Sequence, residues 1–161
     1  MIETARRIAL PRIIVALLTM VGLHSLHLPV LGAELHLGAA TVDITPSGPV
    51  SLTGQKRARI SQKPDTRILA SVLAIEAREG DRVIEQAIMV SCDLVAIRGG
   101  VREKSREKIG KALDDFDPRK LFLAATHTHT APTMIQGRYT LPESGVMQPL
   151  DFVEWATDRI A

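Results

Sequence analysis

The sequence predicts an α/β domain built on a mixed sheet that contains a β-hairpin and a βαβ crossover. Four apolar or alternating runs of strand length are separated by turn residues. An amphipathic helical pattern lies between the third and the fourth run, and a second one closes the sequence. A strand, a helix and a strand in that order favour a parallel strand pair, whereas two strands joined by a tight turn favour an antiparallel pair.

Residues 35–44 (LHLGAATVDI) alternate enough to form the first strand, which ends at the Pro- and Gly-rich residues 45–49. Residues 51–66 are polar and irregular, and we expect a loop there. This loop contains a small basic cluster, which we interpret as solvated rather than as a phosphate site: Lys56, Arg57 and Arg59.

Residues 67–76 and 83–90 are rich in branched apolar side chains and flank the turn residues 79–82, so they predict a β-hairpin. Cys92 follows the second of these strands and is the only cysteine, so no disulfide can form within the chain. We expect Cys92 to be a buried, unreactive thiol.

The next predicted helix covers residues 101–116 and is stopped by Asp117-Pro118. Its apolar residues recur on one face, and we interpret the charged residues between them as a solvated face rather than a binding patch. Residues 121–125 follow as a strand and complete a βαβ crossover with residues 83–90. The unbroken apolar runs of this pair predict strands that are buried on both faces.

Residues 126–149 form a long loop, and loops of this length are often functional. A helical pattern resumes at residues 151–160, and the sequence ends inside it without a stop signal. We therefore expect the sequence to be the amino-terminal, truncated part of a larger domain.

The first 33 residues are typical of a secretory signal peptide. Arg6, Arg7 and Arg12 precede a largely apolar stretch that ends at the small residues Gly32 and Ala33. We predict cleavage near Ala33 and a secreted or periplasmic domain of residues 34–161, without a stable membrane span. The alternative is a retained membrane anchor.

Export changes the charge balance. Residues 1–33 hold three of the 20 basic and one of the 18 acidic residues, which leaves 17 of each. A mature domain near neutrality argues against nucleic acid as a partner.

The segment 126–130 (THTHT) places His127 and His129 directly after a predicted strand. If the backbone stays extended, both rings lie on one face. The pair then clamps one divalent metal, or one ring binds the metal while the other handles a proton or polarises a carbonyl. Asp93, which follows the neighbouring strand, is either a third ligand or a hydrogen-bonded brace for the histidine loop.

Two families with a His-x-His motif are excluded by its surroundings. Metallo-β-lactamase-like hydrolases continue with Asp and His, where this sequence has Ala131 and Pro132. Amidohydrolase barrels carry the motif on their first strand, whereas here several strands precede it.

Three segments occur in the order found in one family: 38–46 (GAATVDITP), 90–94 (VSCDL) and 125–130 (ATHTHT). Together with the strand at 68–76, they resemble neutral/alkaline (non-lysosomal) ceramidases over residues 37–161. The resemblance implies a zinc-dependent amidohydrolase that cleaves N-acylsphingosine to sphingosine and fatty acid.

By position, the resemblance makes His127 a zinc (Zn2+) ligand and His129 a catalytic residue beside the metal that polarises the amide carbonyl. The family's other ligands, a His, a Glu and a Tyr, lie further along a longer chain.

The sequence departs from the family after the histidine pair, where Ser-Gly-Pro-Gly is replaced by residues 130–133 (TAPT). We expect Thr133 to add bulk near the substrate, which widens the expected substrates to lipid amides and other small amides or esters. Two alternatives stay open. One is an inactive secreted binding or structural domain of the same fold. The other is a self-contained metal hydrolase that uses His127, His129 and Asp93.

Overall fold

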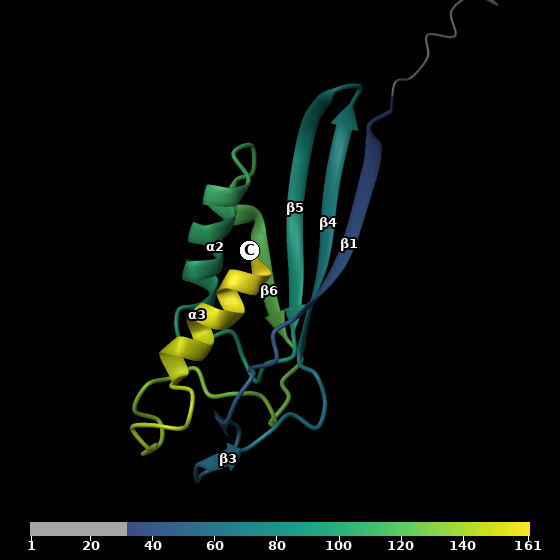
Figure 1. Cartoon of the computed structure of the whole chain (residues 1–161). Coiled ribbons are helices and arrows are strands. Elements are labelled where there is room, and N and C mark those ends of the chain that lie inside the picture. The colour runs from purple at the N-terminus through teal and green to yellow at the C-terminus, as the bar shows by residue number, and fades with distance from the viewer. Residues whose placement is uncertain (1–31) are drawn as a thin grey trace, which may run out of the picture. The chain divides into compact units, whose positions relative to one another are not determined.

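The computed structural model describes residues 32–161, which are coloured in Figure 1. Residues 33–161 form one compact unit. The predicted signal peptide falls mainly on residues 1–31, outside the described part. Within residues 32–161, no helix is long and apolar enough to cross a membrane.

A four-stranded sheet is the framework of the domain, with the strand order β1-β4-β5-β6. The strands are β1 (Glu34–Asp43), β4 (Leu69–Glu79), β5 (Arg82–Cys92) and β6 (Leu121–Ala125). β1 and β5 both pair antiparallel with β4, and β6 pairs parallel with β5. Helix α2 (Val101–Ala112) lies between β5 and β6 in the sequence. The mixed sheet, its hairpin and its βαβ crossover are therefore confirmed.

One face of the sheet is covered by α2 and by α3 (Pro149–Ile160), which lie beside each other (Figure 1). The core between sheet and helices contains strand residues such as Val90 and Leu121 and helix residues such as Val101 and Phe152, all at most 2% exposed. This burial of apolar surface is the main stabilising contribution.

The opposite face of the sheet is open among the described residues. Leu73, Met89 and Phe122 lie side by side in register on three neighbouring strands, and they are 39%, 49% and 54% exposed. Leu121, on the helix side, is fully buried. The prediction that the parallel strands are buried on both faces is therefore wrong for residues 32–161, because only one layer of helices covers the sheet there.

Helix α2 ends at Ala112, four residues before the predicted end, and Leu113 is already extended. Asp114 and Asp115 follow at the carboxyl end, where the helix dipole disfavours negative charge. Phe116 remains in the core, only 8% exposed, although it lies outside the helix.

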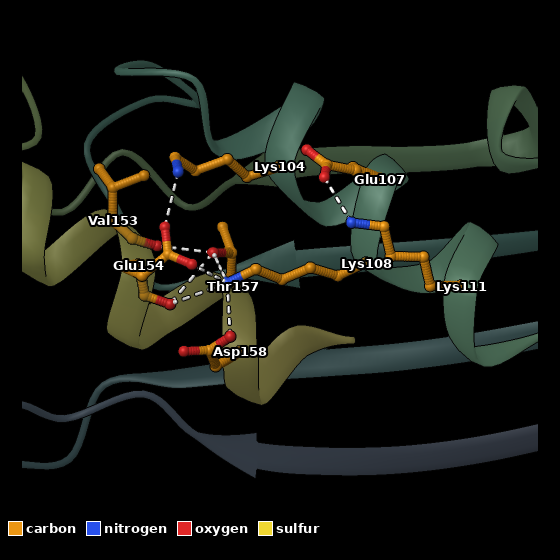
Figure 2. A network of polar contacts seen from close by, with 8 residues as sticks. All are labelled: Lys104, Glu107, Lys108, Lys111, Val153, Glu154, Thr157 and Asp158. Carbon is orange, nitrogen blue, oxygen red and sulfur yellow. Dashed lines mark hydrogen bonds and ion pairs between the residues drawn. The ribbon is translucent and has the colours of Figure 1, made fainter.

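The charged face of α2 is not wholly solvated. The Lys104 ammonium lies 2.6 Å from the Glu154 carboxylate of α3, and Lys108 pairs with both Glu154 and Asp158 (Figure 2). The interpretation of this face as solvated is corrected for Lys108, whose side chain is 22% exposed because α3 packs alongside it, whereas the Lys104 side chain stays 42% exposed.

The region predicted as an irregular loop contains a small hairpin of β2 (Val50–Leu52) and β3 (Arg59–Ser61). Single bridges join β2 to the long loop, between Leu52 and Pro132 and between Val50 and Met147. The loop 126–149 is therefore bound to this hairpin by backbone contacts. A short 3-10 turn, η1 (Pro118–Lys120), leads into β6.

Candidate metal centre after strand β6

The segment that carries the two histidines continues the pairing between β5 and β6. The Thr126 N–H donates to the Cys92 carbonyl at 3.0 Å, and the His127 N–H donates to the Leu94 carbonyl at 2.9 Å. These bonds fix His127 at the carboxyl ends of two parallel strands, where α/β proteins commonly place their binding sites.

His127 is the only non-glycine residue in the described part of the chain with a positive φ, at 64°. The backbone therefore does not stay extended through the motif, and that premise of the sequence argument is wrong. Histidine tolerates the left-handed region better than most residues, but the conformation costs roughly 1–3 kcal/mol and is typical of functional sites.

The turn at His127 brings the two imidazoles together, as predicted, by a different backbone route. The Nε2 atoms of His127 and His129 are 3.4 Å apart, and the ring centroids are 5.0 Å apart with an angle of 67° between the planes. Both residues are exposed.

The two rings differ in how their protons are fixed. Nδ1 of His127 lies 2.7 Å from the Val95 carbonyl oxygen, which can only accept a hydrogen bond. The neutral ring therefore carries its hydrogen on Nδ1, and Nε2 keeps a lone pair that can accept a hydrogen bond from the His129 ring or bind a metal. Metal-binding histidines are commonly oriented in this way. In the described part of the chain, the His129 ring hydrogen bonds only to the His127 ring.

The donors present fit part of a zinc site. Two nitrogens bound to one tetrahedral zinc at about 2.0–2.1 Å are about 3.3 Å apart, close to the separation of the two Nε2 atoms. A catalytic zinc generally has three protein ligands. Residues 32–161 contain no group of three or more His, Cys, Asp or Glu that could hold a metal ion.

Asp93 is a brace for the loop in this structure. One of its carboxylate oxygens accepts a hydrogen bond from the Leu69 N–H at 3.0 Å. The other accepts one from the Thr126 hydroxyl at 3.2 Å. Of the two roles predicted for Asp93, the geometry matches the brace.

The neighbouring Cys92 is fully buried. Burial, and to a smaller extent the charge of Asp93, raises the pKa of its thiol to about 11. The thiolate is therefore scarce near neutral pH, in agreement with the predicted unreactive thiol.

The Asp-Ile-Thr-Pro segment has a structural role. The Asp43 carboxylate accepts a hydrogen bond from the Thr45 N–H at 2.9 Å, and hydrogen bonds with Thr45 hold the pKa of Asp43 below its usual value. The Thr45 hydroxyl in turn accepts a bond from the Ile68 N–H at 2.9 Å. These contacts join the end of β1 to the start of β4.

The sequence did not predict that the β2–β3 hairpin contacts the histidine loop. The Arg59 guanidinium donates to the His129 carbonyl at 2.6 Å, while the residue stays exposed, in agreement with the solvated interpretation of the basic cluster. A cavity of about 270 Å³ lies next to this contact, and Arg59, Thr130 and Pro132 are among its lining residues.

Thr133 is buried, with 3% exposure, and its N–H donates to the Ser51 carbonyl at 2.8 Å. The expectation that it adds bulk near a substrate is therefore corrected, because its side chain is buried in the interior.

Comparison with known proteins shows a similarity of fold. No family model and no curated protein matches the chain. Among solved structures, the neutral ceramidase from Pseudomonas aeruginosa matches it with a TM-score of 0.65 and 23% sequence identity. The match covers 80% of this chain. The fold is similar to part of neutral ceramidase.

A ceramidase complexed with C2 gives a second match, with a TM-score of 0.58, 21% identity and 80% of this chain covered. The chain spans about a fifth of the length of both ceramidase structures, since 20% of each is covered. The predicted α/β class and the resemblance to ceramidases are thus confirmed at the level of the fold. The histidine pair lies at the end of β6 within this ceramidase-like fold.

Proposed function

We propose that the chain is the amino-terminal part of an exported, zinc-dependent amide hydrolase that acts on lipid amides of the N-acylsphingosine type. The observation that supports this most is the convergence of two exposed histidines, whose Nε2 atoms are 3.4 Å apart, in a fold similar to part of neutral ceramidase. Export is supported by the signal-like composition of residues 1–33.

His127 is the zinc ligand in this proposal. The Val95 carbonyl holds the hydrogen of the neutral ring on Nδ1, so Nε2 keeps the lone pair that a metal needs, and a metal there would replace the contact with Nε2 of His129. Zinc bound there would acidify a water molecule, to a pKa of about 7, and polarise a carbonyl group. The remaining ligands would come from outside residues 32–161.

His129 is the catalytic residue. No backbone carbonyl in the described residues fixes the tautomer of its ring, so Nε2 can carry a hydrogen. A hydrogen bond from Nε2 to the amide oxygen strengthens as negative charge develops on that oxygen, which lowers the barrier. Because its Nε2 atom is 3.4 Å from that of His127, this donor lies next to the proposed metal position.

The proposal is tested by hydrolysis of a fluorescent N-acylsphingosine by the protein expressed at the full length of its reading frame. We expect turnover that a chelator abolishes and zinc restores. His127→Ala should remove both zinc and activity. His129→Ala should keep zinc and lower kcat by about 10²–10³-fold, the usual effect of losing one oxyanion donor.

His36, an exposed histidine on β1, provides the matched control, and His36→Ala should leave both measurements unchanged. Wild-type protein that releases no fatty acid from any lipid amide, or an active His127→Ala variant, contradicts the proposal.

A further inference from the structure

His129 needs a positional constraint that its own hydrogen bonds do not supply. Val95 orients the His127 ring, but in the described residues the His129 ring is bonded only to His127. Catalysis through a hydrogen-bond donor requires that donor to be held within a fraction of an ångström. We therefore expect the residues that pack against the His129 ring to supply this constraint.

The backbone of Gly54, in the turn between β2 and β3, packs against His129. A Cβ atom on Gly54 would lie 2.5 Å from Cγ, 2.6 Å from Cβ and 2.8 Å from Nδ1 of His129. All three distances are well below van der Waals contact. Gly54 also has a φ of 90°, which L-residues with a side chain rarely adopt. The imidazole therefore occupies space that only glycine leaves free.

A second contact from the same hairpin holds the His129 backbone. The Arg59 guanidinium donates to the His129 carbonyl at 2.6 Å, which is a charge-assisted hydrogen bond. Gly54 and Arg59 thus contact His129 at its ring and at its carbonyl.

The hairpin is itself fastened to the long loop on both sides of Gly54. The Thr53 N–H donates to the Ala131 carbonyl at 2.9 Å, and the Tyr139 hydroxyl donates to the Gln55 carbonyl at 2.6 Å. These bonds prevent the turn from moving away from the histidine loop without breaking backbone contacts.

We propose that Gly54 and Arg59 are positioning residues that set the placement of the His129 imidazole beside His127. The role of the ring in hydrolysis rests on the proposed function, but its placement does not, so the two can be tested separately.

The primary test is NMR of the imidazole signals in the metal-free chain of 161 residues. Gly54→Ala should shift the signals of His129 and weaken its contacts with His127, while those of His36 stay in place. Gly145→Ala is the matched control, because Gly145 has a φ of 77° but open space around a Cβ. It should leave the His129 signals unchanged.

Arg59→Gln provides a second variant that removes only an exposed side chain, so the test survives if Gly54→Ala does not fold. We expect it to shift the His129 signals, whereas Lys56→Gln, which removes the same charge from the turn of the same hairpin, should not. Unchanged His129 signals in Arg59→Gln and in any folded Gly54→Ala protein overturn the proposal. Equal shifts in the control variants overturn it as well.

In the full-length enzyme, Gly54→Ala should lower kcat by roughly 10²-fold, the scale of a 1 Å misplacement, with zinc affinity unchanged. A displaced His129 ring with unchanged kcat would contradict the role of His129 in the proposed function and leave the positioning intact.

Discussion

At the scale of single residues, the site depends on a backbone conformation that the sequence did not reveal. His127 adopts a positive φ, and this turn, rather than strand alternation, brings its ring to His129. The identity of the two histidines, their place after a strand and their proximity could be predicted, but the backbone conformation that joins them could not. The carbonyl of Val95, which fixes the tautomer of His127, carries no sequence signal because every residue has a carbonyl.

Asp93 gives a prediction at this scale. In Asp93→Asn, the amide oxygen can still accept from the Leu69 N–H, and the amide NH2 can donate to the Thr126 hydroxyl oxygen, so two charge-assisted hydrogen bonds become neutral ones. We expect the free energy of unfolding to fall by about 1 kcal/mol, as measured by urea denaturation.

Asp65→Asn, in the preceding loop, serves as the control and should change stability little. If Asp93→Asn abolished zinc binding without lowering stability, Asp93 would be a ligand rather than a brace.

At the scale of elements, helices α2 and α3 are held together by ion pairs between their side chains as well as by apolar packing. The Glu154 carboxylate accepts hydrogen bonds from Lys104 and Lys108 (Figure 2). These contacts, of which the one with Lys104 has the larger effect, lower the pKa of Glu154 to about 2. A carboxyl whose folded pKa is lowered stabilises the fold above its unfolded pKa, near 4.3, and loses this contribution as the pH falls toward 2.

The double variant Lys104→Gln, Lys108→Gln should therefore lower the urea midpoint at pH 7 and lose this effect by pH 2. Because the pairs are exposed, about 1 M salt should also reduce the difference. Lys111→Gln, which removes a pair within α2 alone, is the control with a smaller expected effect. A difference between the double variant and wild type that persists at pH 2 would contradict this account.

The strands and helices themselves could largely be predicted, because hydrophobic periodicity is a local signal. β6 agrees with its predicted limits, and α3 begins two residues earlier than predicted. The β2–β3 hairpin was missed because its strands have three residues each and little periodicity. The contact of Arg59 with His129 spans 70 positions, and no local pattern encodes such a separation.

At the scale of the whole molecule, the sheet has one covered and one open face in the described residues. Leu121→Ala removes a fully buried side chain and should cost about 2–5 kcal/mol of unfolding free energy. Phe122→Ala, next in the strand but 54% exposed, should cost less than about 1.5 kcal/mol in the 161-residue chain. Urea denaturation of both variants compares the two faces directly. Equal costs would mean that another segment covers the open face.

The ceramidase structures that the chain resembles are about five times as long as the matched region. Two nitrogen donors in residues 32–161 are therefore expected to contribute part of a zinc site rather than all of it.

The most direct test of the central claim is anomalous X-ray diffraction at the zinc edge from crystals of the zinc-loaded protein. The account predicts a peak about 2.0–2.1 Å from Nε2 of His127 that is absent in His127→Ala. A zinc peak elsewhere, with His127 Nε2 uncoordinated, would contradict it.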